Sequence, residues 1–186
     1  SACLGCGKLQ PMHWTAYRAD GTRAGMLWDT NERTERKTNS NDPNERWRWN
    51  ELRQTIRWEC VYCGHRHADD ALTRRRLVAG GHFVSAAPDA PPEHQSFNYN
   101  QLIMPDLGWF ETQQGGVFNW LHAIAEARQG MEARLRGFVQ KILAEPYDPR
   151  KFSHFDKLPT IEVKTEGEEI IAEGIAFKHR LRSEER

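Results

Sequence analysis

Four short runs in the first sixty positions are rich in aromatic residues and alternate partly between apolar and polar side chains. They cover residues 10–14, 25–28, 46–49 and 56–59. Alternation with a period of two is typical of half-buried β-strands. We expect the first two runs to form one side of a small β structure and the last two to form the other side.

The chain between these two pairs of runs is almost purely polar. Residues 31–44 (NERTERKTNSNDPN) offer no apolar side chain to bury, and they include Pro43, which interrupts helices. This composition favours a mobile surface loop between the two strand pairs.

The second half of the chain has helical periodicity. Residues 68–79 read as a short helix that begins with two aspartates and ends at a Gly-Gly pair. Proline and glycine accumulate over residues 85–116, where aromatic residues and a strand-like run at 97–104 indicate an ordered connector. Apolar residues then recur at helical spacing over 117–125 and 131–143, which predicts two helices that pack on each other or on a neighbouring domain.

Charge and hydropathy limit the classes of protein that fit. The 186 residues carry 26 basic and 26 acidic side chains, a balance that argues against a wholly basic nucleic-acid binder but allows a local basic patch. No stretch reaches the about 20 apolar residues of a membrane helix, so we expect a soluble, cytoplasmic protein without a membrane partner. Because the chain starts at Ser1 and not at Met, we expect one module of a longer polypeptide.

All four cysteines lie in two copies of one pattern, C-x-x-C-G. The first copy holds Cys3 and Cys6, and the second holds Cys60 and Cys63. A C-x-x-C turn brings two thiolates to one point, and the glycine after it supplies the positive φ that the turn needs. Two such knuckles give the four thiolates of one structural zinc ion per chain. Use of the cysteines as redox pairs or disulfides is the alternative, although neither pair follows a βαβ unit.

The spacing of the knuckles departs from that of a compact zinc ribbon. Residues 7–59, or 53 positions, separate them, against about 15–20 in the usual four-cysteine template. Loop-closure entropy grows only logarithmically with length, so a metal can offset the cost of a long insertion. Because four thiolates already complete the shell, we expect the nearby histidines to be polar groups at the surface or beside the ligands: His13, His65 and His67.

The predicted fold class is therefore α+β. It consists of small zinc-ribbon β hairpins with a long loop insertion, followed by an extended connector and a two-helix segment. Residues 1–85 would form the ribbon with its short helix, and residues 86–150 the connector and helical pair. Residues 151–186 read as a charged tail, with a short hairpin expected around Gly167.

Five arginines are candidates for contacts with nucleic acid: Arg46, Arg48, Arg74, Arg75 and Arg76. In a strand at 46–49, the arginines would share one face and the tryptophans the other, as in a surface that grips phosphates and stacks bases. The alternative is that the tryptophans pack a ribbon too small to have another core, with solvated arginines. We favour the packing interpretation.

Several of these elements occur together in a known family. The two C-x-x-C-G knuckles flank a tryptophan-bearing hairpin region, and a short helix ends in Gly81-His82-Phe83. Further along come a Phe-Asn element at residues 97–102 and a helix that ends in FVQKILAEPY at residues 138–147. In this order, over about residues 1–150, they resemble the zinc-bearing middle region of tailed-phage terminase large subunits of the lambda gpA-like group.

The resemblance implies a place between a packaging ATPase and a nuclease that cuts concatemeric DNA. It carries over only the four cysteines, as zinc ligands, because the sequence contains neither the G-x-x-x-x-G-K-[ST] motif nor the acidic nuclease cluster. The expected role is a zinc-stabilised, DNA-positioning module whose partners are double-stranded DNA and other terminase domains or subunits. A free-standing zinc-ribbon protein that binds nucleic acid or regulates is the main alternative, and an enzyme with an unfamiliar site is a third.

Overall fold

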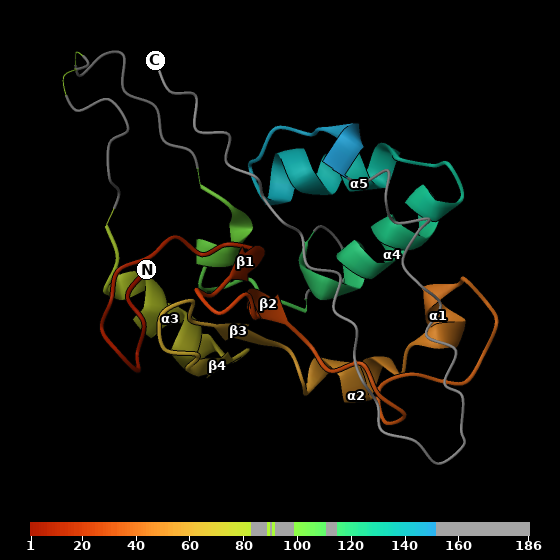
Figure 1. Cartoon of the computed structure of the whole chain (residues 1–186), viewed down its shortest axis with the longest axis horizontal. Helices are drawn as coiled ribbons and strands as arrows, with labels where there is room; N and C mark the ends of the chain where they lie inside the picture. The colour runs from red at the N-terminus through yellow and green to blue at the C-terminus, as the bar shows by residue number, and fades with distance from the viewer. Residues whose placement is uncertain (83–88, 90, 92–98, 111–114, 152–186) are drawn as a thin grey trace. The chain divides into compact units, whose positions relative to one another are not determined.

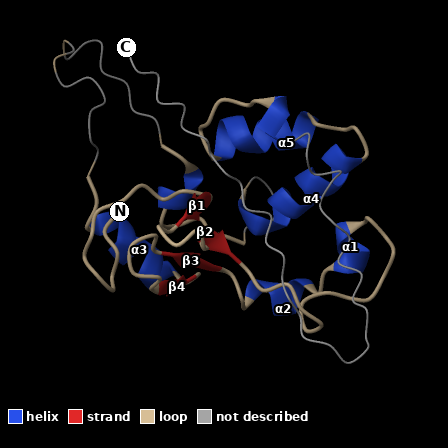
Figure 2. Cartoon of the chain, in the orientation of Figure 1, coloured by secondary structure: helices blue, strands red, loops and turns tan. Residues whose placement is uncertain are grey.

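The centre of the structure is a four-stranded antiparallel sheet with the strand order β1-β2-β3-β4. The computed structural model describes residues 1–82, 89, 91, 99–110 and 115–151. The strands are β1 (Thr15–Tyr17), β2 (Arg23–Leu27), β3 (Arg57–Glu59) and β4 (Arg66–Ala68). Gly25 pairs with Thr15 on one side and with Glu59 on the other. The sheet and the helices around it confirm the α+β class (Figure 2).

Five α-helices accompany this sheet in the described part of the chain (Figure 1). Two short ones, α1 (Pro43–Arg46) and α2 (Trp49–Arg53), lie in the long insertion between β2 and β3. α3 (Ala71–Ala79) follows β4. α4 (Gly116–Arg128) and α5 (Ala133–Gly137) form the expected helical pair, and α5 continues into a π-helical turn at Phe138–Ile142. No helix among the described residues is long and apolar enough to cross a membrane.

Residues 43–49, in the insertion between β2 and β3, differ from the predicted loop and strand. Residues 46–49 are not a strand, because α1 ends at Arg46 and α2 begins at Trp49, and Trp47 forms only an isolated bridge with Glu35. Pro43 begins a helix instead of interrupting one. Proline is well suited to the first helical position, where its missing N–H has no partner to lose.

Polar side chains organise the segment that we expected to be a mobile loop. The Asp42 carboxylate accepts a hydrogen bond from the Asn44 N–H (2.9 Å) and caps α1. The Thr34 hydroxyl is buried and donates to the Asp29 carbonyl (2.9 Å). These polar contacts give the segment a defined course with Pro43 as its one buried apolar side chain, which is why its hydropathy did not reveal it.

The connector also lacks the predicted strand in its described part. Residues 101–103 form a 3-10 turn, which the Asn100 carboxamide caps by accepting the Leu102 N–H (3.1 Å). The same side chain donates to the Met12 carbonyl (2.7 Å) and fixes the connector against the start of the chain. Phe83, residues 92–98 and the hairpin expected around Gly167 lie outside the described residues.

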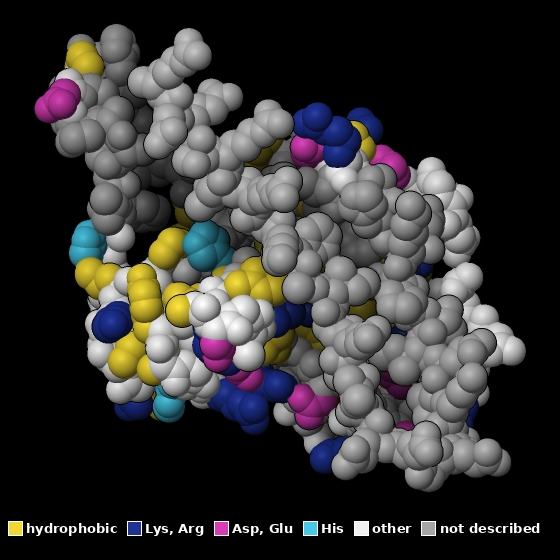
Figure 3. All heavy atoms as spheres, viewed as in Figure 1, with side chains coloured by type: hydrophobic (Ala, Val, Ile, Leu, Met, Phe, Trp, Pro, Cys, Tyr) yellow, Lys and Arg dark blue, Asp and Glu magenta, His cyan; other side chains and the backbone are white. Residues whose placement is uncertain are grey.

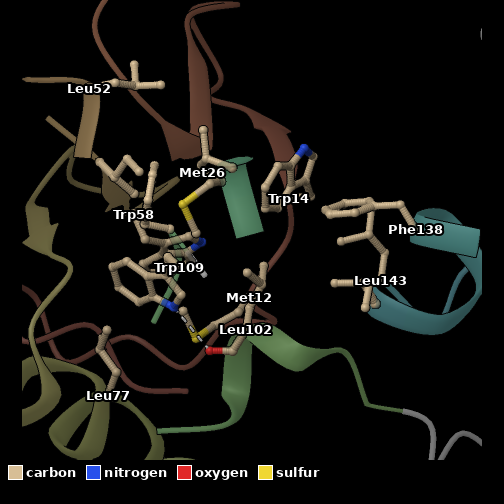
Figure 4. Close-up of a cluster of buried hydrophobic side chains, with 14 of the residues drawn as sticks. Met12, Trp14, Met26, Leu52, Trp58, Leu77, Leu102, Trp109, Phe138 and Leu143 are labelled. Carbon is tan, nitrogen blue, oxygen red and sulfur yellow. Dashed lines mark hydrogen bonds between the residues drawn. The ribbon is translucent and has the colours of Figure 1, made fainter. Parts of the chain in front are cut away.

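An aromatic core joins the sheet to the helical pair. Trp14, just before β1, is buried, and its ring centroid lies 5.0 Å from that of Phe138 and 5.5 Å from that of Trp120. Figure 4 shows Trp14 and Phe138 facing each other across this contact. Trp58 on β3 and Trp109 in the connector are fully or almost fully buried, and their indole N–H groups donate to backbone carbonyls. Packing is thus the role of these tryptophans.

A buried ion pair attaches α3 to the connector. Asp69 pairs with Arg74, and the Asp69 carboxylate also accepts the N–H groups of Trp109 (3.0 Å) and Phe110 (3.1 Å). The Arg74 Nε donates to the Pro105 carbonyl (3.0 Å). Both charged side chains are only 10% exposed. Because each has lost its contact with water, the attraction between them has to compensate for that loss.

We therefore expect Asp69→Ala to lower the free energy of unfolding by about 3–5 kcal/mol, because it leaves a buried guanidinium and two N–H groups without their acceptor. The matched control is Asp106→Ala. Its carboxylate pairs with Arg75 where both side chains are largely exposed, and this change should cost no more than about 1 kcal/mol. Urea unfolding of the two variants at saturating metal measures the difference; equal midpoints would contradict the assignment.

Candidate metal centre

The sheet places the second knuckle, and the first is tied to α3. Cys60–His65 is the turn of the β3–β4 hairpin, so the strand pairing fixes the positions of Cys60 and Cys63. The first knuckle is closed by a bridge between Ala2 and Leu9. The Ala2 N–H donates to the Leu77 carbonyl at 3.1 Å, which attaches this turn to α3. Two separate elements therefore bring the four cysteines together.

The knuckles repeat one backbone geometry. Gly7 and Gly64 have φ values of 70° and 71°, and their N–H groups donate to the carbonyls of Cys3 (2.8 Å) and Cys60 (3.0 Å). Each first sulfur also accepts a backbone N–H, from Gly5 at 3.3 Å and from Tyr62 at 3.4 Å. The positive φ expected for the glycine after each pair is confirmed, and the N–H groups face the sulfurs as an anionic ligand requires.

The four sulfur atoms have the spacing of a metal shell. They all lie within 4.8 Å of one another, with Cys3 Sγ 3.7 Å from Cys63 Sγ and Cys6 Sγ 3.9 Å from Cys60 Sγ. A tetrahedron with zinc–sulfur bonds of about 2.3 Å has edges of about 3.8 Å. All four cysteines are free thiols. The donor set and its spacing therefore fit a metal ion, and soft thiolates are the ligands that zinc prefers.

Without a cation, the four thiols hold their protons unequally. Burial raises the pKa of the Cys60 thiol, but hydrogen bonds from Gln10 and from the N–H groups of Cys63 and Tyr62 outweigh burial and bring the pKa to about 6. Burial raises the pKa of Cys3 to about 12. Neighbouring thiolates repel each other, so only a bound cation stabilises four of them at neutral pH.

Gln10 supports the centre from outside the shell. Its side chain is buried, its amide Nε2 donates to Cys60 Sγ (3.0 Å), and its Oε1 accepts the Val61 N–H (3.2 Å). The two bonds orient the amide and link the segment that follows the first knuckle to the second knuckle. We did not identify Gln10 from the sequence, because glutamine has no spacing rule that marks it as a partner of a thiolate.

Glu59, directly before Cys60, carries a compact ion-pair network that holds the end of β3. It is buried and pairs with Arg18 (2.5 Å), Arg57 (2.9 Å) and Arg66 (3.1 Å). Burial raises the pKa of Glu59, but the hydrogen bonds from Arg57 and Arg18 lower it by more, so the net pKa is below the usual value. Arg18 also approaches the Cys60 carbonyl at 3.5 Å. The network thus fixes the end of β3, which Cys60 directly follows.

The histidines near the knuckles lie beside the thiol cluster and are not part of it among the described residues. His13 and His65 are exposed. His67 is buried against Trp58, with 5.5 Å between the ring centroids, and burial brings its pKa to about 4. His67 is therefore a neutral core residue at neutral pH.

The five candidate arginines occupy different environments. Arg48 and Arg76 are exposed, and Arg75 is exposed with its guanidinium on Asp106 (3.0 Å). Arg46 is half-buried and pairs with Glu35 (3.2 Å). Arg74 differs from the expectation of a surface group, because its guanidinium is buried on Asp69 and Pro105. The structure does not bring the five side chains to one surface, and contact with nucleic acid stays a prediction.

Comparison of the chain with protein-family models, with curated proteins and with solved structures finds no match. The assignment of function therefore depends on the geometry of the site.

Cys60→Ser should remove the metal and unfold the ribbon, because metal binding contributes about 10–16 kcal/mol, more than most small domains have in total stability. Elemental analysis should then fall from one zinc ion per chain to none, with loss of the far-ultraviolet dichroism of the folded chain. Tyr62→Ala, an exposed position between two ligands, is the control and should retain the ion. Retention of zinc by Cys60→Ser would contradict a shell of four sulfurs.

Gln10→Leu should weaken zinc binding about 10–100-fold, since it removes the donor that stabilises the Cys60 thiolate. Competition with a chromophoric chelator measures this affinity. Dichroism at saturating zinc should match that of the unaltered protein, which separates a loss of affinity from a loss of folding. Gln140→Leu, an exposed change on the π-helical turn, should leave the affinity unchanged.

Proposed function

We propose that this chain is a zinc-stabilised structural module that positions DNA, and that it corresponds to the middle region of a viral terminase large subunit. The observation that carries the structural role is the closed set of four cysteine sulfurs within 4.8 Å of one another. A zinc ion held by four thiolates has no open coordination position for water or substrate. The ion would fix the architecture of the ribbon and supply no Lewis acid.

The resemblance of the motifs supports the terminase part of this proposal. Both knuckles and the FVQKILAEPY helix end stand in the order of that family, and the structure joins the segments that carry them. Phe138, at the start of that element, packs on Trp14 between the first knuckle and β1. A module with this core can transmit position between neighbouring domains, because the ribbon and the helical pair share buried side chains.

The surface charge favours a modest electrostatic role with DNA. Among the described side chains visible in Figure 3, Lys and Arg side chains lie next to Asp and Glu side chains. Exposed Arg48 and Arg76 have no ion pair within the described part of the chain. A few such cations give weak contacts with phosphates that carry little sequence information.

A free-standing zinc-ribbon protein that recognises nucleic acid is the second candidate. The same exposed arginines favour it, and the affinity of the isolated chain discriminates between the two. Tight, steeply salt-dependent binding would support the free-standing binder, whereas weak binding fits a module that holds DNA beside other domains.

For the zinc-loaded chain on duplex DNA, we expect weak binding that decreases with salt. Arg76→Gln should weaken it for all sequences alike and reduce the slope of log affinity against log salt by about 1, as loss of one phosphate contact does. Lys37→Gln is the control, because Lys37 is exposed and already paired with Glu32. Fluorescence anisotropy at several salt concentrations measures both. Affinity without salt dependence would contradict the phosphate contact.

A further inference from the structure

A cleft of about 730 Å³ lies between the helices of the second half and α1. Of the helices that frame it, α4 lies between α1 and α5 in Figure 1 and contacts both. Its volume falls within the range of about 300–1,000 Å³ that holds small-molecule ligands. The cleft does not involve the cysteines, so it is separate from the candidate metal centre.

One helical face forms a wall of this cleft. Arg134, Gly137, Phe138 and Lys141 all line it, and their spacing of i, i+3, i+4 and i+7 puts them on one side of α5 and the π-helical turn. Gly137 leaves a gap in this wall, because a Cβ atom there would meet nothing within 4 Å.

The charged groups of the lining are cationic. Arg134 and Lys141 are exposed and reach the cleft from positions seven residues apart on the same wall. The Arg134 Nε pairs with Glu126 (3.2 Å), which orients the guanidinium, and Lys141 has no ion pair within the described residues. No aspartate or glutamate lines the cleft in the described part of the chain, and the amides of Asn119 and Gln101 add neutral hydrogen-bonding groups. Two cations with amide donors suit a phosphate group.

The opposite wall is aromatic and includes a histidine with a buried ring nitrogen. Phe118 and His122 on α4 line the cleft, and their ring centroids are 4.6 Å apart. The His122 Nε2 is buried and has no hydrogen-bond partner among the described residues. The His122 ring stacks on Trp49, which holds it in place (5.7 Å between centroids, 20° between planes). An aromatic wall beside a cationic one is the combination that receives a base and its phosphate.

We propose that this cleft binds a nucleotide unit, with the phosphate on Arg134 and Lys141 and the base against Phe118. The unit can be a free mononucleotide or one nucleotide of a single strand, since both present the same phosphate and base. This inference goes beyond the proposed function, because it needs neither the zinc ion nor contact with duplex DNA.

The experiment uses the full zinc-loaded chain with two probes, thymidine monophosphate and a thymidine octanucleotide. Binding is followed by calorimetry and by the ring resonances of His122. In the free protein, burial and then the positive charge of Arg134 lower the pKa of His122, against the opposing charges of Asp42 and Glu126. A bound phosphate anion brings negative charge to the same ring, so its pKa should rise on saturation.

Matched variants at Gly137 and at the cations locate the binding. Gly137→Leu should fill the open space and weaken binding roughly tenfold or more, whereas Gly137→Ala should stay within about twofold. Gly137 has helical angles (φ −60°, ψ −41°), so both variants should fold and keep their zinc. Lys141→Gln should cost about tenfold, as loss of a charge-assisted hydrogen bond does. Arg136→Gln is its control, because Arg136 faces the Tyr147 ring.

Saturable binding of either probe with this pattern of variants supports the inference, and the stronger probe identifies the source of the nucleotide. Binding of the octanucleotide that ignores Gly137→Leu and Lys141→Gln would place it elsewhere and overturn the inference. No binding of either probe at millimolar concentration would do the same. Neither failure affects the zinc content, so the proposed metal role is tested apart from this one.

Discussion

The ribbon depends on the convergence of four thiols from two knuckles that are separated by the 53 residues 7–59. As thiolates, they repel one another, and as thiols they form no strong contact. A divalent cation bound by the four sulfurs would convert this repulsion into closure of the loop between them. The β3–β4 hairpin and the link from Ala2 to α3 bring the sulfurs within reach, but a small sheet of three- to five-residue strands has little other cohesion.

A second constraint couples this ribbon to the helical pair. The buried cluster contains Cys3 and Cys60 together with Trp14, Trp109 and Phe138, so two of the four candidate ligands and the helices belong to one continuous core. It includes residues on both sides of the boundary predicted near residue 85. Packed aromatic side chains interdigitate with few voids. A displacement of the π-helical turn at Phe138 would therefore also displace the Trp14 ring, which packs against it.

The sequence was most informative where structure is encoded locally. The knuckles follow from cysteine and glycine spacing, and α3 and the α4–α5 pair follow from capping and periodicity. Trp47 and Trp49 were misassigned because their alternation with arginine imitates a strand, whereas Asp42 and Pro43 start a helix just before them. Gln10 contacts Cys60, 50 positions away, and the pair of Asp69 and Arg74 is buried by connector residues 31 to 41 positions away, contacts that only the tertiary fold creates. Such contacts leave no periodic signal.

The ion pairs separate the cations that stabilise the fold from those that stay exposed without an acidic partner among the described residues. Three arginines pair with Glu59, and Arg74 pairs with Asp69, so these four cations stabilise the fold. A closed thiolate shell offers a ligand nothing to coordinate. Cations such as Lys141 and Arg76 lie outside these networks and keep their charge for a partner. The chain has no net charge. Where it holds an anion therefore depends on such local excesses of positive charge and not on its total charge.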